Sequence, residues 1–304
     1  MPRTLLVGHP GVTWKDWLRE NLAGQPLICL DPADPYQSPP GRLRLSVGDQ
    51  TRSWRFYGSL DAQRAPHILL AALVKLAAAA PTAPAVQITH RPTPLLRQFL
   101  QATCEVFRPE RILVAAGTKI DRDGFPIGPE DVDLAAAPPP LVASAQHKAQ
   151  WIKLLDQAVI HTLNMDQLTL EGVRLGSGKA TTVEELRHLG LSEVLHVETS
   201  GATALVVSEE PLDERSMGRI SNHFEVQRSI VVSPASYQGL LCSFARPDGE
   251  DFGMGVIDRI DFASREIHVR NTAEPGSAPR LLRIGALRLS SAGVELGELK
   301  PWQV

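Results

Sequence analysis

A glycine turn between an apolar segment and a helical one is the first place where this sequence could do chemistry. Residues 5–18 read LLVGHPGVTWKDWL. A phosphate-binding loop has the pattern G-x-x-x-x-G-K-[ST], in which backbone N–H groups cradle phosphates, the lysine bridges them and the hydroxyl holds Mg²⁺. Gly8 fits the first position, but Thr13, Trp14 and Lys15 stand in the glycine, lysine and hydroxyl positions. The turn therefore lacks the groups on which this chemistry depends.

A structural turn is the other interpretation of the same residues. Thr13 can cap the N-terminus of a helix, with Asp16 three residues further on. Trp14, Trp17 and Leu18 have the spacing of one apolar helix face. Taken alone, the segment favours this structural interpretation.

Two carboxylates follow the next apolar strand. Residues 30–43 read LDPADPYQSPPGRL, in which Asp31 and Asp34 precede Gln37 and a Pro-Pro-Gly turn. In a parallel sheet, ligands bind beyond the carboxyl ends of the strands. These acids are therefore candidates for a site, although an acidic loop bounded by prolines is also common.

β-rich and helical segments alternate in the first half of the chain, which predicts a parallel sheet covered by helices. Strands are expected at 3–8, 25–31, 84–89 and 110–116, and helices at 14–22, 62–79 and 94–107. Residues 117–144 are expected to form a loop or hinge, followed by a short helix at 145–158.

The second half has short β-rich runs broken by glycine, proline and aspartate, which predicts a mainly β module. The runs lie at 193–199, 203–208, 228–233, 238–245, 253–261, 265–270 and 281–289. We therefore expect two domains, an α/β domain over residues 1–158 and a smaller β-rich module over 159–304.

The amino-acid composition argues against several classes of protein function. The 304 residues are 43% hydrophobic and 21% charged, with a net charge of -3, which is unlike a general nucleic-acid binder. No apolar run is long enough to span a membrane and the first residues do not resemble a secretory signal, so a cytoplasmic protein is expected. Cys29, Cys104 and Cys242 are far apart and indicate buried core residues rather than a metal site or disulfides. Oligomeric state is not indicated.

Several segments, in order along most of the chain, resemble the polynucleotide 5'-hydroxyl kinases, the RNA kinases of messenger-RNA 3'-end, tRNA and ribosomal-RNA processing. After the glycine turn, residues 31–41 look like the family's D-x-D-x-G-Q segment followed by P-G, with Tyr36 where a glycine is usual. Thr89 matches the threonine of a later D/N-T-x-G clasp, whereas Ile88 and Arg91 depart from it. Residues 236–302 resemble the family's C-terminal module.

The resemblance implies a P-loop NTPase-like sheet with helices on both faces, with ATP and Mg²⁺ as cofactors and RNA or RNA-processing proteins as partners. It makes Asp34 the candidate catalytic residue. The nucleotide-binding positions that it implies are Gly8, Gly11, Thr13, Lys15, Gln37 and Thr89.

The departures from the family pattern fall on its chemistry. The loop lysine, its hydroxyl neighbour, the clasp glycine and an arginine-bearing lid are all missing, and the region corresponding to the lid has only His147, Lys148 and Lys153. Phosphoryl transfer depends on such positioned charges. We therefore expect a degenerate member, an RNA-processing or RNP-binding component with weak or no phosphotransfer. The alternatives are an active ATP-dependent RNA 5'-hydroxyl kinase with an altered loop, and an α/β scaffold without a ligand.

Two other segments allow a functional and a structural interpretation. Residues 42–64 mix five arginines with Trp54, Phe56 and Tyr57, which suits single-stranded nucleic acid but also a hairpin edge with its aromatics turned to the core, the interpretation that we favour. Residues 172–182, GVRLGSGKATT, resemble a second glycine-lysine loop, yet are expected to be a turn before a helix at 183–189. The glycines at 239, 253 and 255 are expected at tight backbone positions in strands.

Overall fold

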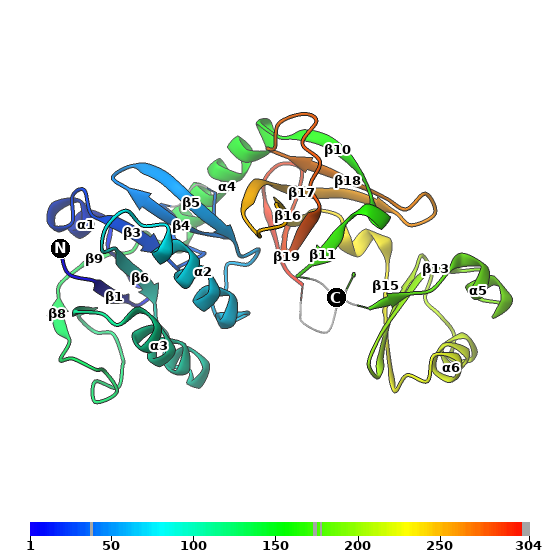
Figure 1. Ribbon diagram of the computed structural model, residues 1–304, viewed down its shortest axis with the longest axis horizontal. Coiled ribbons are helices and arrows are strands. Elements are labelled where there is room, and N and C mark those ends of the chain that lie inside the picture. Colours follow the sequence, from blue (N-terminus) through cyan, green and yellow to red (C-terminus); the bar gives the residue numbers. More distant parts are fainter. Residues whose placement is uncertain (37–38, 173–174, 177, 300–304) are drawn as a thin grey trace. The chain divides into compact units, whose positions relative to one another are not determined.

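The chain folds into two compact units, Met1–Gln150 and Trp151–Val304, in a computed structural model that describes residues 1–36, 39–172, 175–176 and 178–299 (Figure 1). The division falls inside a helix, α4 (Pro140–Asp156). Each unit has its own sheets and its own buried core.

A seven-stranded sheet forms the centre of the first unit, in the order β5-β4-β3-β6-β1-β7-β8. The five strands from β3 to β8 in this order run parallel, and β4 and β5 add an antiparallel hairpin at one edge. The expected parallel sheet is thus confirmed. The strands are β1 (Thr4–Gly8), β3 (Pro26–Cys29), β4 (Arg42–Val47), β5 (Gln50–Phe56), β6 (Ala85–Thr89), β7 (Arg111–Ala115) and β8 (Glu130–Val132).

Helices cover both faces of this sheet, as the alternation of side chains along each strand requires. The helices of the first unit are α1 (Lys15–Asn21), α2 (Pro66–Ala78), α3 (Pro94–Phe107) and the first part of α4. Leu5 and Val7 of β1 belong to the larger core, which also contains the buried side chains of α2 and α3. Leu6 points to the other face, where it packs with Trp14 and with Trp17 of α1.

Two local expectations in the first unit were wrong. Residues 117–144 are not a continuous loop, because they contain β8, β9 (Ala135–Ala136) and the start of α4 at Pro140. Proline is well tolerated in the first turn of a helix, where its missing N–H has no partner to lose. Thr13 is not the helix cap either, since β2 (Val12–Thr13) pairs with β9 and Trp14 precedes α1 instead.

The second unit is β-rich, as expected, and contains a larger and a smaller sheet. One has the order β10-β18-β17-β16-β19-β11, with β20 paired to β19, and the other has the order β12-β13-β14-β15. The strands are β10 (Val159–Asn164), β11 (Thr169–Glu171), β12 (Lys179–Ala180), β13 (Val194–Ser200), β14 (Thr203–Ser208), β15 (Arg228–Val232), β16 (Leu240–Ala245), β17 (Asp251–Asp261), β18 (Glu266–Asn271), β19 (Leu281–Leu289) and β20 (Glu295–Glu298).

Two helices accompany the smaller of these sheets. The predicted helix at 183–189 is present as α5 (Val183–His188), with the Thr182 hydroxyl accepting the Glu185 N–H at 3.3 Å. Gly172 and Gly176 in the preceding segment have positive φ, as a turn requires, whereas residues 173, 174 and 177 lie outside the described part. The amphipathic α6 (Glu214–His223) was not predicted from the sequence.

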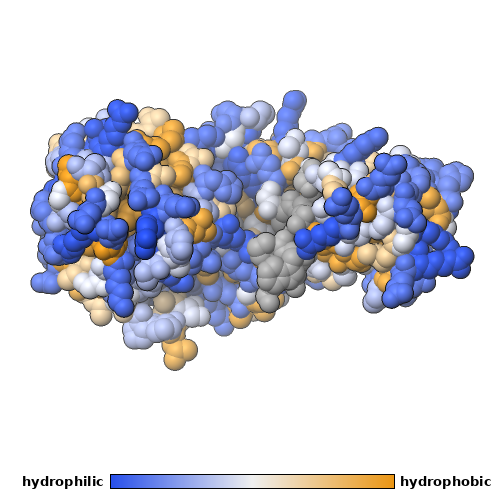
Figure 2. All heavy atoms as spheres, turned by 90° about the horizontal axis from the view of Figure 1, so that it is seen from below, coloured by the Kyte–Doolittle hydropathy of each residue, from blue (hydrophilic) through white to orange (hydrophobic). Residues whose placement is uncertain are grey.

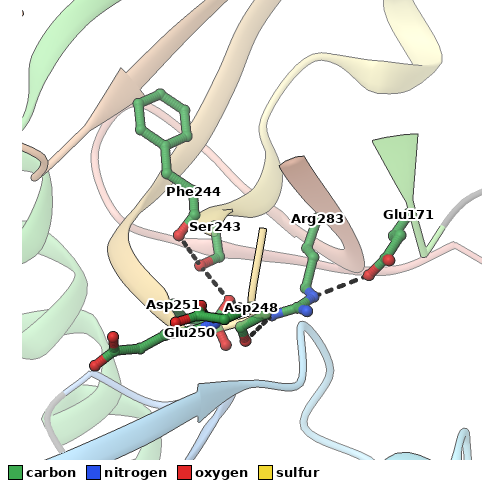
Figure 3. A network of polar contacts seen from close by, with 8 residues as sticks. Glu171, Ser243, Phe244, Asp248, Glu250, Asp251 and Arg283 are labelled. Atoms are coloured by element: carbon green, nitrogen blue, oxygen red, sulfur yellow. Dashed lines mark hydrogen bonds and ion pairs between the residues drawn. The ribbon is translucent and has the colours of Figure 1, made fainter. Parts of the chain in front are cut away.

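In the larger sheet of the second unit, the buried Asp251 carboxylate forms an ion pair with Arg283 (Figure 3). Arg283 of β19 donates to Asp251 at 2.8 Å and to Glu171 of β11 at 3.0 Å. The Ser243 hydroxyl of β16 also donates to Asp251, at 2.9 Å. Because Asp251 is only 5% exposed, its charge requires these partners, and the network joins four strands of the sheet, β11, β16, β17 and β19.

No helix among the described residues is both long and apolar enough to cross a lipid bilayer. On the face of the molecule that Figure 2 shows, hydrophobic residues lie in small groups among hydrophilic ones. All three cysteines are buried, as expected from their positions in apolar segments.

Gly253 and Gly255 occupy crowded positions in β17, as predicted, whereas Gly239 lies in the turn just before β16. A Cβ on Gly255 would lie far inside van der Waals contact with the Arg270 carbonyl of the neighbouring strand, and one on Gly253 would clash with Asn271. Gly239 has a φ of +79° and faces the Leu289 carbonyl. These glycines permit the close approach of β17 to β18 and of the start of β16 to β19.

We predict that Gly255→Ala lowers the free energy of unfolding by about 3 kcal/mol, because the methyl group must push two strands apart. Gly218→Ala is the matched control, since Gly218 lies inside α6 with open space around its Cβ position. That change should raise stability by about 0.5–1 kcal/mol. Urea unfolding measures both; equal effects of the two substitutions would contradict the packing described for Gly255.

Candidate functional site

The glycine turn at the end of β1 is closed by a tryptophan side chain. Trp14 is 3% exposed and its indole lies over Gly8, so that a Cβ on Gly8 would be 2.8 Å from Trp14 Nε1. The Trp14 ring also meets Trp17 edge to face at 5.4 Å. Trp14 Nε1 has no hydrogen-bond partner among the described residues. The indole therefore packs on the sheet face beside Leu6 and lies against the first glycine of the turn.

The other polar groups of the turn are directed at the protein itself. The Gly11 N–H donates to His9 Nδ1 at 3.0 Å, and the Thr13 hydroxyl accepts the Lys15 N–H at 3.3 Å. The Lys15 ammonium lies 4.4 Å from the centre of the Tyr36 ring, a cation–π contact. Lys15 thus lies beside the acidic segment after β3, away from the turn.

Asp31 and Asp34 lie beyond the carboxyl end of β3, as expected, and Thr89 at the end of β6 joins them. Thr89 Oγ1 donates to Asp31 at 2.5 Å, and the Ala33 N–H donates to the same carboxylate at 2.9 Å. Asp34 accepts from the Tyr36 N–H at 2.8 Å and from Gln87 of β6 at 3.3 Å. The candidate catalytic carboxylate is therefore already hydrogen-bonded within the chain.

Burial raises the pKa of two groups here, Asp31 and the neighbouring Cys29. Burial, and next the charge of Asp34, raise the pKa of Asp31, while the hydrogen bond from Thr89 opposes the shift. Burial and the same carboxylates also raise the pKa of Cys29 well above its ordinary value, so this thiol stays protonated. Such a cysteine is not a nucleophile, because the thiolate is the reactive form.

A pocket of about 740 Å³ opens beside these residues, between α1 and the sheet. Lys15 and Asp34 line it, together with Gln87 of β6 and Arg44 of β4. We call this pocket the α1 groove. No grouping of histidine, cysteine, aspartate or glutamate side chains in the described part of the chain could hold a metal ion.

The structure brings most of the sequence-predicted residues to one edge of the sheet. Gly8, Gly11 and Thr13 lie in the turn after β1, Lys15 begins α1, and Asp34 and Thr89 lie beyond β3 and at the end of β6. Gln37 lies outside the described residues.

Gln87 of the α1 groove was missed from the sequence, because β6 otherwise has the pattern of a buried strand. Arg44 of β4 belongs to the arginine-rich segment, for which we favoured a hairpin edge over a nucleic-acid site. The signal was available in "AVQIT", where a glutamine interrupts an apolar strand at a position that faces away from Val86 and Ile88.

The arginine-rich segment forms the edge hairpin β4–β5. Phe56 and Tyr57 are buried, 6% and 7% exposed, which confirms that these aromatic rings turn to the core. Trp54 is half-buried with the Arg42 guanidinium 5.7 Å from its ring centre. Burial, and next the neighbouring Arg44, lower the pKa of Arg42 to about 10. Two arginines thus crowd the same face of this hairpin.

Comparison with solved structures identifies the fold. No protein-family model and no curated protein sequence matches the chain. Two structures of Clp1p, a polynucleotide kinase family member, in complex with Pcf11p each give a TM-score of 0.53 at 12% identity. They cover 94% of this chain and 75% and 74% of the matched chains. One of them concerns the loss of ATP in a glycine-to-arginine point mutant. At this identity the likeness establishes a Clp1p-like α/β fold and nothing about activity.

We predict that Gly8→Ala lowers the free energy of unfolding by about 1–3 kcal/mol, because its methyl group clashes with the Trp14 indole. In a Trp14→Leu background the indole is gone, and the added cost of Gly8→Ala should fall below about 0.5 kcal/mol. Urea unfolding of the four chains forms the cycle. An unchanged cost in both backgrounds would show that the indole does not lie on Gly8.

The raised pKa of Asp31 predicts a pH dependence of stability. Between its ordinary value of 3.8 and its raised value, the folded chain binds more protons than the unfolded one. The contribution of Asp31 to the free energy of unfolding therefore falls as pH rises through that window. Asp31→Asn removes this loss, because an amide does not titrate. The amide can still accept from the Ala33 N–H and donate to the Thr89 hydroxyl. Relative to the variant, the unaltered chain should lose stability in urea unfolding as the pH rises above 3.8; parallel curves would refute the shift.

Proposed function

We propose that this chain is a degenerate polynucleotide-kinase-fold protein that serves as an RNA-binding or assembly component of RNA processing, with weak or no phosphotransfer. The observation that carries the proposal is the Trp14 indole on Gly8. A triphosphate needs the backbone N–H groups and the lysine of this turn, and here the indole and the Tyr36-bound Lys15 replace them. The residues present do not fit ATP and Mg²⁺ in the usual loop.

The likeness to Clp1p supports the RNA-processing part of the proposal. Clp1p is seen in its structures with a protein partner, Pcf11p. A chain that keeps this fold but lacks the phosphate loop can still bind other molecules through its surface. A role in binding RNA or RNA-processing proteins follows from that, without a catalytic step.

One observation favours the rival function, an active RNA 5'-hydroxyl kinase with an altered loop. Lys15 and Asp34 line the same α1 groove, so a cation and a carboxylate face one space. In this rival, Asp34 accepts the proton of the attacking hydroxyl, and its present bonds to Tyr36 and Gln87 must first be released. Because Asp34 is already committed to those bonds, we favour the degenerate function.

Calorimetric titration with Mg-ATP tests the proposal. We expect a dissociation constant weaker than about 100 µM, because Trp14 excludes the phosphates. Replacing Thr13, Trp14 and Lys15 by Gly, Lys and Ser should restore nucleotide binding before any catalysis. A dissociation constant in the low micromolar range for the unaltered chain would contradict the proposal.

A transfer assay separates the rival. Labelled phosphate should not be transferred from ATP to a 5'-hydroxyl oligoribonucleotide by the unaltered chain. Transfer that Asp34→Asn abolishes would establish the active kinase instead.

A further inference from the structure

The second face of the seven-stranded sheet changes from apolar to polar across its width. Beneath α1, β7 and β1 present Leu113 and Leu6 on this face. The paired registers then lead from Leu6 to Gln87 of β6, on to Cys29 of β3 and to Arg44 of β4. A sheet face covered by a helix is normally apolar throughout. The polar half is the floor of the α1 groove.

Buried polar atoms on this floor lack partners. Gln25 is 5% exposed and gives its amide N–H groups to the Pro2 and Ala83 carbonyls, while its Oε1 accepts nothing among the described residues. Arg44 Nε is likewise buried without a hydrogen bond in the described part of the chain. Both residues line the α1 groove. Because buried polar atoms are nearly always hydrogen-bonded, an unpaired acceptor and donor on two residues that line one groove favour a polar ligand there.

Positively charged side chains favour the binding of an anion in one part of the α1 groove. Lys15 and Arg19 stand on the α1 side and Arg44 on the floor. Of the two acids, Asp34 is held by hydrogen bonds within the chain, and Asp49 lies at the β4–β5 turn, at the other end. Arg19 pairs with Asp16 at 3.2 Å in a solvent-exposed contact, which contributes little. Phosphates are therefore best placed near Lys15 and Arg44.

The α1 groove is elongated along the strands. Its lining runs from Asp34 and Tyr36 at the carboxyl end of β3 to Gly24 at the amino end, so it spans the whole strand. The four residues of β3 alone cover roughly 13 Å at about 3.3 Å per residue. A space of this length and of about 740 Å³ suits a linear chain of nucleotides better than a single compact one.

We propose that the α1 groove binds a short single-stranded oligonucleotide, with phosphates at Lys15 and Arg44 and base edges at Gln25 and Gln87. The inference rests on the proposed RNA-binding function and gives it a location. The site lies on the sheet face under α1, so it does not require the blocked turn. An oligonucleotide supplies anionic groups for the cations and polar base edges for the unpaired atoms of the floor.

Fluorescence anisotropy with labelled hexauridylate tests the proposal on the full chain. Binding is expected at about 1–100 µM near physiological salt. Lys15→Gln and Arg44→Gln should each weaken it at least threefold and reduce the slope of log affinity against log salt by about 0.7, since each removes one phosphate contact from a single strand. Lys75→Gln on α2 is the matched control, because it makes the same charge change on the opposite face. Its affinity and slope should equal those of the unaltered chain.

The outcomes separate this inference from the proposed function. Lys15 is exposed, so its variant keeps the test valid if Arg44→Gln fails to fold. Hexauridylate binding that both groove variants retain would overturn the α1 groove and leave the RNA-binding function standing. No binding by the unaltered chain would also overturn it, leaving assembly through protein partners. Equal competition by AMP at the same phosphate concentration would show a mononucleotide pocket and contradict the oligonucleotide.

Discussion

The Trp14 indole on the backbone of Gly8 is the contact on which the candidate site depends. It closes the turn after β1 and at the same time fills the space between that strand and α1, packing with Leu6 and Trp17. A small residue at position 14 would leave a cavity there. The packing that stabilises this part of the sheet therefore holds the indole against the turn.

The arrangement of the acidic segment after β3 depends on the same contact between Trp14 and Gly8. Because Lys15 does not enter the turn, its ammonium is free to lie on the Tyr36 ring, and Asp34 bonds to backbone and Gln87. Asp31 and Thr89 meet at the neighbouring strand ends, where the resemblance to the kinases placed them. The carboxylates at this edge of the sheet thus hold the loop after β3 in place through hydrogen bonds to its backbone.

Periodicity predicted most of the first unit, because buried parallel strands and amphipathic helices have strong patterns. The start of α1 was misplaced because the pairing of Thr13 with Ala135 is a long-range contact that no local pattern reveals. The α1 groove was missed for a related reason. Gln87 and Arg44 are far apart in sequence, and only the order of β6, β3 and β4 in the sheet makes them neighbours on one floor. The closing of the turn was foreseeable, since a tryptophan at that position must either face the ligand space or pack on the sheet.

The most direct test of the account is the indole N–H resonance of Trp14 in a spectrum of the ¹⁵N-labelled chain, assigned by its loss in Trp14→Phe. Since this ring is 3% exposed and lies against Gly8, its N–H should exchange slowly with solvent and keep its position when Mg-ATP is added to about 1 mM. A fast-exchanging resonance that shifts and saturates at micromolar Mg-ATP would mean that the indole leaves the turn and that a nucleotide takes its place.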